Sequence, residues 1–282
     1  MSQKTTHRIL SAVLTTSAAG VLLAGCVGSP DAAPATSLPA ASASAPTSSE
    51  TATPPASDAA VSQDDAIAVV KSYLSAVQAE QWTDAYALLS DGARTAVGSE
   101  QQFADAAASG IVRPDAAAGY LGTDGVIEAT EGPVAGSVLV TAVRDRIADA
   151  WLVRPADGDA RIDDAGVPPT GQSPYEWVNP AAGPEDVRDV APLDPSAPAA
   201  IIFTDLAEDA GENLVGYPDE LTAYLGTTEA AASLASSEDQ LRWDIPVDTE
   251  QLASGTVPLT VVWKAGGDGD LWRTSTTALF LP

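Results

Sequence analysis

Cysteine and histidine are almost missing from this chain. Cys26 is the only cysteine and His7 the only histidine among 282 residues. A single cysteine forms no disulfide within its own chain, so the folded part must be held by hydrophobic cores. Both residues fall in or next to a predicted leader. Once that leader is removed, the absence of histidine excludes Ser-His-Asp and Cys-His catalysis and His-ligated zinc.

Basic residues are also scarce, with 13 Lys and Arg against 39 Asp and Glu. Lys4 and Arg8 lie in the leader, so the remaining chain has 11 basic and 39 acidic residues, a formal charge of −28. Such a charge repels phosphates, and we expect neither nucleic acid nor an anionic lipid surface as a partner. No phosphate-binding glycine loop or metal-ligand spacing is present, and no cofactor is predicted.

Long apolar runs are absent apart from Ile9–Leu23. This segment follows a basic start and is short of the ~20 residues that span a bilayer. It ends in the small residues Ala24 and Gly25 before Cys26. Basic start, apolar stretch and small-residue cleavage site predict a secretory signal peptide at residues 1–25. The alternatives are an uncleaved membrane anchor and a signal with an incidental cysteine.

The sequence Leu23-Ala24-Gly25-Cys26 resembles the lipobox of bacterial lipoproteins. The resemblance implies that the mature chain begins at Cys26, acylated with palmitate-type chains on its thiol and amine. It further implies a lipid anchor in the cell membrane on the outer, extracytoplasmic face. Several acyl chains give lasting attachment, whereas one does not.

Residues 26–60 are predicted to be a disordered tether. Of the 34 residues from 27 to 60, 28 are Ala, Ser, Thr or Pro, and none is aromatic. Such a segment buries too little apolar area to offset its chain entropy.

Residues 61–165 are predicted to form an α+β domain. Ser62 and Asp65 form a capping box before an apolar pattern of helical spacing that continues to Val77. Thr83 is expected to cap a second helix, and Ser99 with Gln102 a third. The pattern then alternates in four predicted strands, with Asp157-Gly158-Asp159 as a hairpin turn. The strands are Val126–Thr130, Ser137–Val143, Ala148–Arg154 and Ala160–Asp163.

The stretches AVVKSYLSAVQAEQWTDAYALLS and AWLVRPADGDARIDD resemble the nuclear transport factor 2-like superfamily of cone-shaped α+β domains. That fold encloses a pocket between helices and sheet, which some members use for catalysis with Asp and His. Without histidine, this role does not transfer. Five aromatic residues either line such a pocket or simply form the core: Tyr73, Trp82, Tyr86, Phe103 and Trp151.

Residues 166–198 are rich in proline and glycine and are interpreted as an interdomain connection. Tyr175–Val178 and Ala199–Phe203 are candidate strands. The run from Val257 to Trp263 alternates, and Pro258 suggests an exposed edge or a position outside the ladder. The segment from Gly266 to Asp270 is expected to reverse the chain.

Residues 199–282, above all WDIPVDTEQLASGTVPLTV, resemble the immunoglobulin-like domains of bacterial surface proteins. This implies an all-β sandwich. The Ala- and Leu-containing stretch from Leu221 to Ser236 fits a helix equally well, so its structure is left open.

Two acidic turns raise the question of calcium. One holds Asp157, Asp159, Asp163 and Asp164, and the other Asp268 and Asp270. Neither has the helix-loop-helix calcium pattern, and Asp and Gly are common in turns for local reasons. Asp84 and Asp105 are interpreted as solvated helix charges, and no metal site is predicted.

The sequence therefore predicts a non-enzymatic, lipid-anchored module that binds or assists a protein or glycan of the bacterial cell envelope. The alternative is small-ligand binding or carboxylate-based catalysis in the pocket of the α+β domain. A third option is a spacer or assembly factor.

Overall fold

The computed structural model describes most of the chain after residue 59. The described residues are 60–108, 113–164, 175–181, 190–204, 218, 221–237, 240–253, 255–264 and 272–282. All of them belong to one compact unit, Thr53–Pro282. The predicted signal peptide and nearly all of the predicted tether lie outside the described residues, as does the expected turn at Gly266–Asp270.

The first described part is helical. Its helices are α1 (Gln63–Gln78), α2 (Trp82–Ala87), α3 (Asp91–Val97), α4 (Glu100–Ala108) and α5 (Pro114–Leu121). The predicted cap at Ser62 is confirmed, because its hydroxyl accepts a hydrogen bond from the Asp65 amide at 3.1 Å. No helix among the described residues is long and apolar enough to cross a membrane.

An antiparallel sheet follows the helices, in the order β1-β2-β3-β4. Its strands are β1 (Val126–Glu131), β2 (Val138–Arg144), β3 (Ile147–Ala156) and β4 (Asp159–Ile162), close to the predicted bounds. The predicted hairpin turn is confirmed between β3 and β4. Asp157 and Gly158 have φ of 54° and 85°, as a two-residue turn with both φ values positive requires.

The rest of the described chain forms two more antiparallel sheets, and the only helical element there is a short 3-10 turn at Thr249–Leu252. One sheet has the order β5-β6-β10-β9 and the other β12-β11-β7-β8. The strands are β5 (Tyr175–Asn179), β6 (Ala199–Thr204), β7 (Leu221–Leu225), β8 (Thr228–Ala230), β9 (Ser233–Ser237), β10 (Gln240–Ile245), β11 (Val257–Lys264) and β12 (Trp272–Leu279). The stretch that the sequence left open is therefore strand, not helix.

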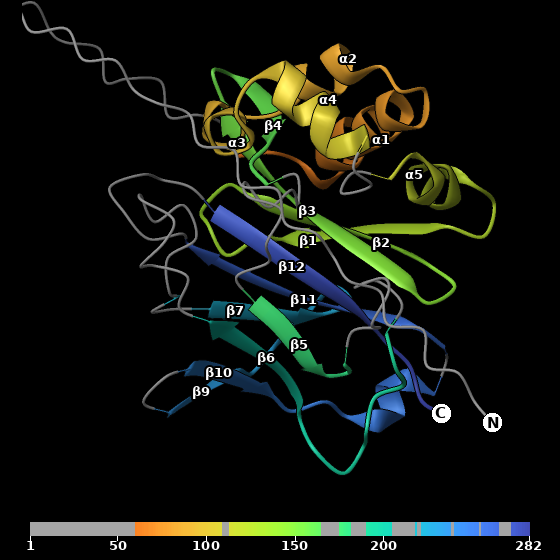
Figure 1. The fold of residues 1–282 in the computed structure, drawn as a ribbon, viewed down its shortest axis with the longest axis vertical. Coiled ribbons are helices and arrows are strands. Elements are labelled where there is room, and N and C mark those ends of the chain that lie inside the picture. Colours follow the sequence, from red (N-terminus) through yellow and green to blue (C-terminus); the bar gives the residue numbers. More distant parts are fainter. Residues whose placement is uncertain are drawn as a thin grey trace, which may run out of the picture. The chain divides into compact units, whose positions relative to one another are not determined.

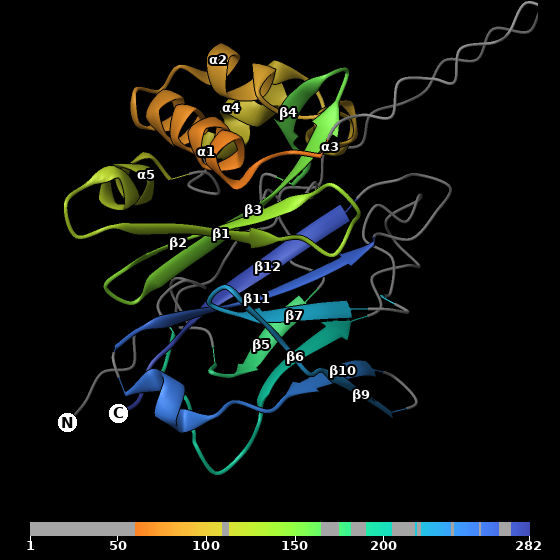
Figure 2. The same ribbon diagram turned by 180° about the vertical axis from the view of Figure 1, so that it is seen from behind.

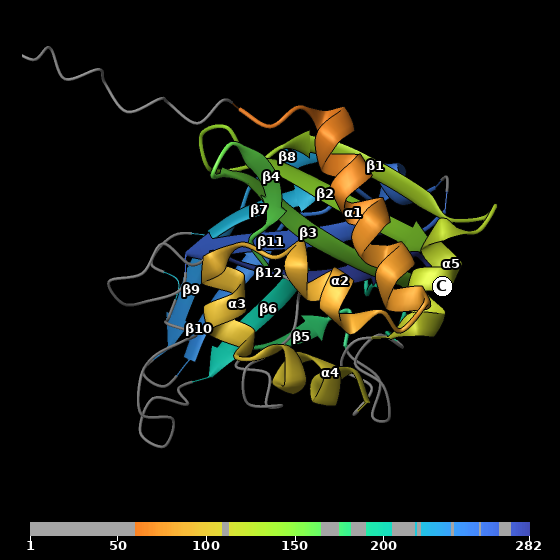
Figure 3. The same ribbon diagram turned by 90° about the horizontal axis from the view of Figure 1, so that it is seen from above.

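The three sheets stack, with the helices on the outer face of the first (Figures 1 and 2). In Figure 3, α1 runs across the strands of this sheet. Successive residues of β2 show that both faces of this sheet are packed against other elements. Val138 and Val140 pack with the helices, whereas Leu139 packs with Val262 of β11 on the opposite face.

The sheet β12-β11-β7-β8 is the middle layer and is covered on both faces. Val261 and Trp263 point into a core shared with β5, β6 and β10. Val262 and Tyr224, one residue out of phase, pack instead against the sheet that carries the helices. Burial and the nearby Glu229 and Glu131 charges raise the pKa of Tyr224 to about 12, so this hydroxyl remains protonated between the sheets.

Two local expectations need correction, one of them only in part. Thr83 does not cap α2. This helix begins at Trp82, and Gln81 before it makes no side-chain cap. Of the two alternatives for Pro258, an exposed edge is wrong, because β11 lies between β12 and β7. A position outside the ladder is confirmed on the β7 side, where pairing begins at Leu259. The carbonyl of Pro258 accepts from the Gly226 amide at 2.8 Å, in the turn that ends β7. The backbone N and O of a strand residue point to the same side. The nitrogen of Pro258, which has no hydrogen to donate, therefore faces the turn after β7, and no hydrogen bond between β11 and β12 is lost.

The β3–β4 turn gives a stability test. Gly158→Ala puts a Cβ on a residue with φ of 85°, where nothing crowds the added atom, so the cost is backbone strain alone. We expect a loss of about 1 kcal/mol in the free energy of unfolding, measured by urea denaturation. Asp157→Asn is the control, because Asn accepts positive φ readily and should change stability by only a few tenths of a kcal/mol.

Candidate functional site

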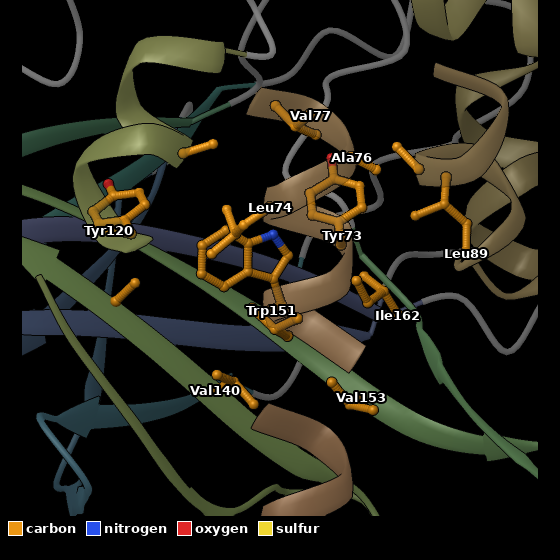
Figure 4. Packing of buried hydrophobic residues seen from close by; sticks show 14 of the residues in the cluster. Tyr73, Leu74, Ala76, Val77, Leu89, Tyr120, Val140, Trp151, Val153 and Ile162 are labelled. Carbon is orange, nitrogen blue, oxygen red and sulfur yellow. The ribbon is translucent and has the colours of Figure 1, made fainter. Parts of the chain in front are cut away.

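The five aromatic residues that the sequence proposed for a pocket lie in one hydrophobic core between the helices and the first sheet. Tyr73, Phe103 and Trp151 are buried, and Trp82 and Tyr86 are partly buried and pack against them. In Figure 4, Tyr73 and Trp151 lie among aliphatic side chains such as Leu74 and Ile162.

These aromatic residues form two groups. Trp151 packs edge-on against Tyr120 at 6.2 Å between ring centroids. Phe103 contacts Trp82 edge-on at 6.2 Å and Tyr86 at 6.1 Å. The Tyr86 hydroxyl donates to the Gly98 carbonyl at 2.7 Å, so its polar end is bonded within the fold. The packing is that of a core, in which the ring edges and faces contact one another.

The residues predicted for lipid attachment, Cys26 with Leu23, Ala24 and Gly25, lie outside the described residues.

Two consecutive carboxylates after β4 are buried, which the sequence did not reveal: it ended the predicted strand at Asp163 and counted both residues in an acidic turn. Asp163 and Asp164 are 4% and 2% exposed. Asp163 accepts from the Ser90 hydroxyl at 2.7 Å, which also caps α3, and from Arg154 at 3.1 Å. Asp163 therefore ties β4 to β3 and to the start of α3.

Asp164 connects the two halves of the described chain. It accepts from the backbone amide of Thr274 at 2.6 Å and from the Thr274 hydroxyl at 3.2 Å. It also pairs with Arg273 at 3.3 Å, and that arginine side chain is 8% exposed. This cluster joins residues more than 100 positions apart in the sequence.

The four aspartates of the first acidic turn are thus divided between different environments. Asp157 and Asp159 are exposed in the hairpin, and Asp159 pairs with Arg161 at 2.9 Å. Asp163 and Asp164 are buried against arginines instead. No group of three or more possible metal ligands occurs in the part of the chain that the structure describes. Asp268 and Asp270 lie outside that part.

The surface has an open pocket of about 420 Å³ where the α1–α2 turn meets α4. Its lining residues are Glu80, Gln81, Trp82, Thr83, Asp84, Glu100, Gln101 and Ala104. Trp82 is partly buried, and the three carboxylate residues are exposed. The Thr83 hydroxyl donates to the Glu100 carboxylate, which joins α2 to the first turn of α4. Asp84 lies in this pocket, whereas Asp105 accepts from Gln101 at 2.9 Å.

Only part of this pocket was visible in the sequence. Trp82 and Asp84 were singled out for other reasons, and the contribution of Glu80, Glu100 and Gln101 depends on how α4 folds back on α2. A tryptophan between acidic residues, EQWTD, is the one local signal that could have pointed to it.

Comparison with known proteins finds no match among family models, curated proteins or solved structures.

The Asp164 cluster predicts a large difference between two ion pairs. Asp164→Ala leaves the Arg273 charge buried without its carboxylate and should cost about 3–5 kcal/mol of unfolding free energy. Asp159→Ala removes an exposed pair and should cost less than about 1 kcal/mol. Urea denaturation measures both. Adding Arg273→Met to Asp164→Ala should restore part of the loss, and an additive or larger loss would contradict the role given to the pair.

Asp163 predicts an unusual pH dependence. Burial raises the pKa of Asp163, outweighing the opposing effects of the Ser90 hydrogen bond and the Arg154 charge. The native state therefore holds this proton more tightly than the unfolded state does. The contribution of Asp163 to stability is full below its unfolded pKa and is lost as pH rises through its folded pKa. Wild type should gain stability relative to Asp163→Asn as pH falls from 7 to about 4.

Asp115 supplies the control of opposite sign. The hydrogen bond from Arg113 lowers the pKa of this exposed carboxyl, so wild type should lose stability relative to Asp115→Asn over the same pH range. The effect should be small because solvent screens the pair. If the difference in unfolding free energy from wild type changed with pH in the same direction for both variants, the opposite pKa shifts of Asp163 and Asp115 would be contradicted.

Proposed function

We propose that this chain is a lipid-anchored bacterial lipoprotein on the outer face of the cell membrane. The observation that carries the proposal is the position of the only cysteine, directly after Leu23-Ala24-Gly25 and a 15-residue apolar segment. Cleavage before Cys26 and acylation of its thiol and amine would attach the mature chain to membrane lipid. The Ala/Ser/Thr/Pro-rich segment up to residue 60 would then separate the folded part from the bilayer.

The folded part would act as a non-enzymatic binding or accessory module for an envelope protein or glycan. Its support is chemical: the mature chain would have no histidine, and its one thiol would carry lipid. The buried aspartates Asp163 and Asp164 are bonded to arginines within the fold, an arrangement of structural ion pairs.

For the fold we propose a nuclear transport factor 2-like domain followed by an immunoglobulin-like domain. Helices packed on one face of the antiparallel sheet β1–β4 support the first assignment. Two four-stranded antiparallel sheets that share one core support the second.

The alternative function, ligand binding or carboxylate catalysis inside the helix-and-sheet domain, has less support. The space between helices and sheet is occupied by buried side chains, including Tyr73, Phe103 and Trp151. A carboxylate mechanism needs two carboxyl groups facing a shared substrate site. The buried carboxylates at the end of β4 are committed to arginine, serine and threonine groups of the fold.

Expression in a bacterial host with an alkyne-tagged fatty acid tests the anchor. The full chain should take up the label, sediment with membranes and resist extraction by high salt, and mass spectrometry should find Cys26 as the acylated first residue. Cys26→Ser keeps the size of the side chain but removes the thiol, so it should be unlabelled. Wild type that stays in the cytosol with Met1 and a free thiol would overturn the proposal.

A further inference from the structure

The pocket between the α1–α2 turn and α4 is open to solvent, has room for a small molecule and has a mostly polar lining. Its volume of about 420 Å³ lies within the roughly 300–1,000 Å³ typical of small-molecule pockets. The side chains that line it combine one aromatic ring with carboxylate, carboxamide and hydroxyl groups. A concave site with one apolar wall and several polar groups both holds and orients a ligand.

The apolar wall of the pocket is held in a fixed orientation. The indole of Trp82 packs edge-on against Phe103 at 6.2 Å, and Phe103 is fully buried. Trp82 nevertheless keeps part of its surface exposed and lines the pocket. A ring anchored on one side and open on the other loses little conformational freedom when a ligand packs on it.

The polar lining accepts more hydrogen bonds than it donates. Glu80, Asp84 and Glu100 contribute carboxylates, which only accept when ionised, and no lysine or arginine is among the described residues that line the pocket. The Thr83 hydroxyl already donates to Glu100. Gln81 and Gln101 can donate and accept through their carboxamides, and Gln101 donates to Asp105. A complementary ligand is therefore rich in donors and positively charged.

We propose that this pocket binds an amino sugar with a free, unacetylated amine. A hexosamine ring has hydroxyl and ammonium donors at its rim for the carboxylates and carboxamides, and an apolar C–H face for the indole. An ammonium group near Trp82 gains a cation–π attraction in addition to its charge pairing. The excess of acidic residues over the whole chain draws such a cation to the surface.

The inference rests on the proposed function, of which it specifies the glycan partner. The two fail separately: fatty-acid labelling at Cys26 reports only on the anchor, and the titration below only on the pocket.

Calorimetric titration of the detergent-solubilised full chain with a glucosamine trisaccharide tests the proposal. The N-acetylglucosamine trisaccharide is the matched ligand without charge, and 1,4-diaminobutane supplies amines without a sugar ring. We expect the glucosamine trisaccharide to bind at least about tenfold more tightly than either, and its affinity to fall as salt is raised.

Variants locate the site. Glu80→Gln and Asp84→Asn change exposed side chains and should each weaken binding about two- to fivefold. Glu128→Gln makes the same change of charge on the exposed part of β1, outside the pocket, and should leave the affinity unchanged. Trp82→Ala should abolish measurable binding.

Loss of binding in Trp82→Ala alone would not suffice, because this ring also packs against Phe103. The Glu80→Gln/Asp84→Asn double variant therefore decides the matter. Binding by the double variant as tight as wild type, equal binding of the acetylated trisaccharide, or diamine binding as tight as that of the sugar would overturn the proposal. Absence of heat with the glucosamine trisaccharide at millimolar concentrations would do the same.

Discussion

The structure depends on burying both faces of one sheet. In β11, Val261 and Trp263 belong to one core and Val262 to another. A strand with water on one side would need polar residues at every second position, whereas residues 257–263 of this strand are apolar or threonine on both faces. The sheet that carries the helices and the sheet formed by β5, β6, β10 and β9 therefore have to cover it from opposite sides. Neither covering layer could be lost without exposing a row of large apolar side chains to solvent.

The polar contacts at this packing surface follow from the same constraint. A charge buried between layers is costly unless it is paired and hydrogen-bonded. Asp164 satisfies both conditions through Arg273 and Thr274, and the adjacent Asp163 does so on the helical side through Arg154 and Ser90. Two neighbouring residues of one strand end thus serve two different layers, because successive side chains of an extended chain point to opposite faces.

Much of the local structure could be predicted from the sequence. The hydroxyl of Ser62, the apolar runs of β2 and β3 and the Asp157-Gly158 turn are signals that act within a few residues. The short helices α3 and α5 were missed, since an alanine-rich turn or two has little periodicity to detect. The strands between Leu221 and Ser237 could not be distinguished from a helix because their identity comes from pairing with β11 and β10. The stacking of the sheets and the burial of Asp164 depend on contacts between residues over 100 positions apart, which no local pattern encodes.

The position of Thr274 has a consequence for how copies of this protein meet one another. It lies on β12, the outermost strand of its sheet, and its amide is directed at the Asp164 carboxylate. An outermost strand normally displays unpaired amides that recruit a strand from a neighbouring molecule and so begin aggregation. Here one of these amides is occupied by a side chain of the same molecule. This arrangement would hinder strand-by-strand polymerisation along that border.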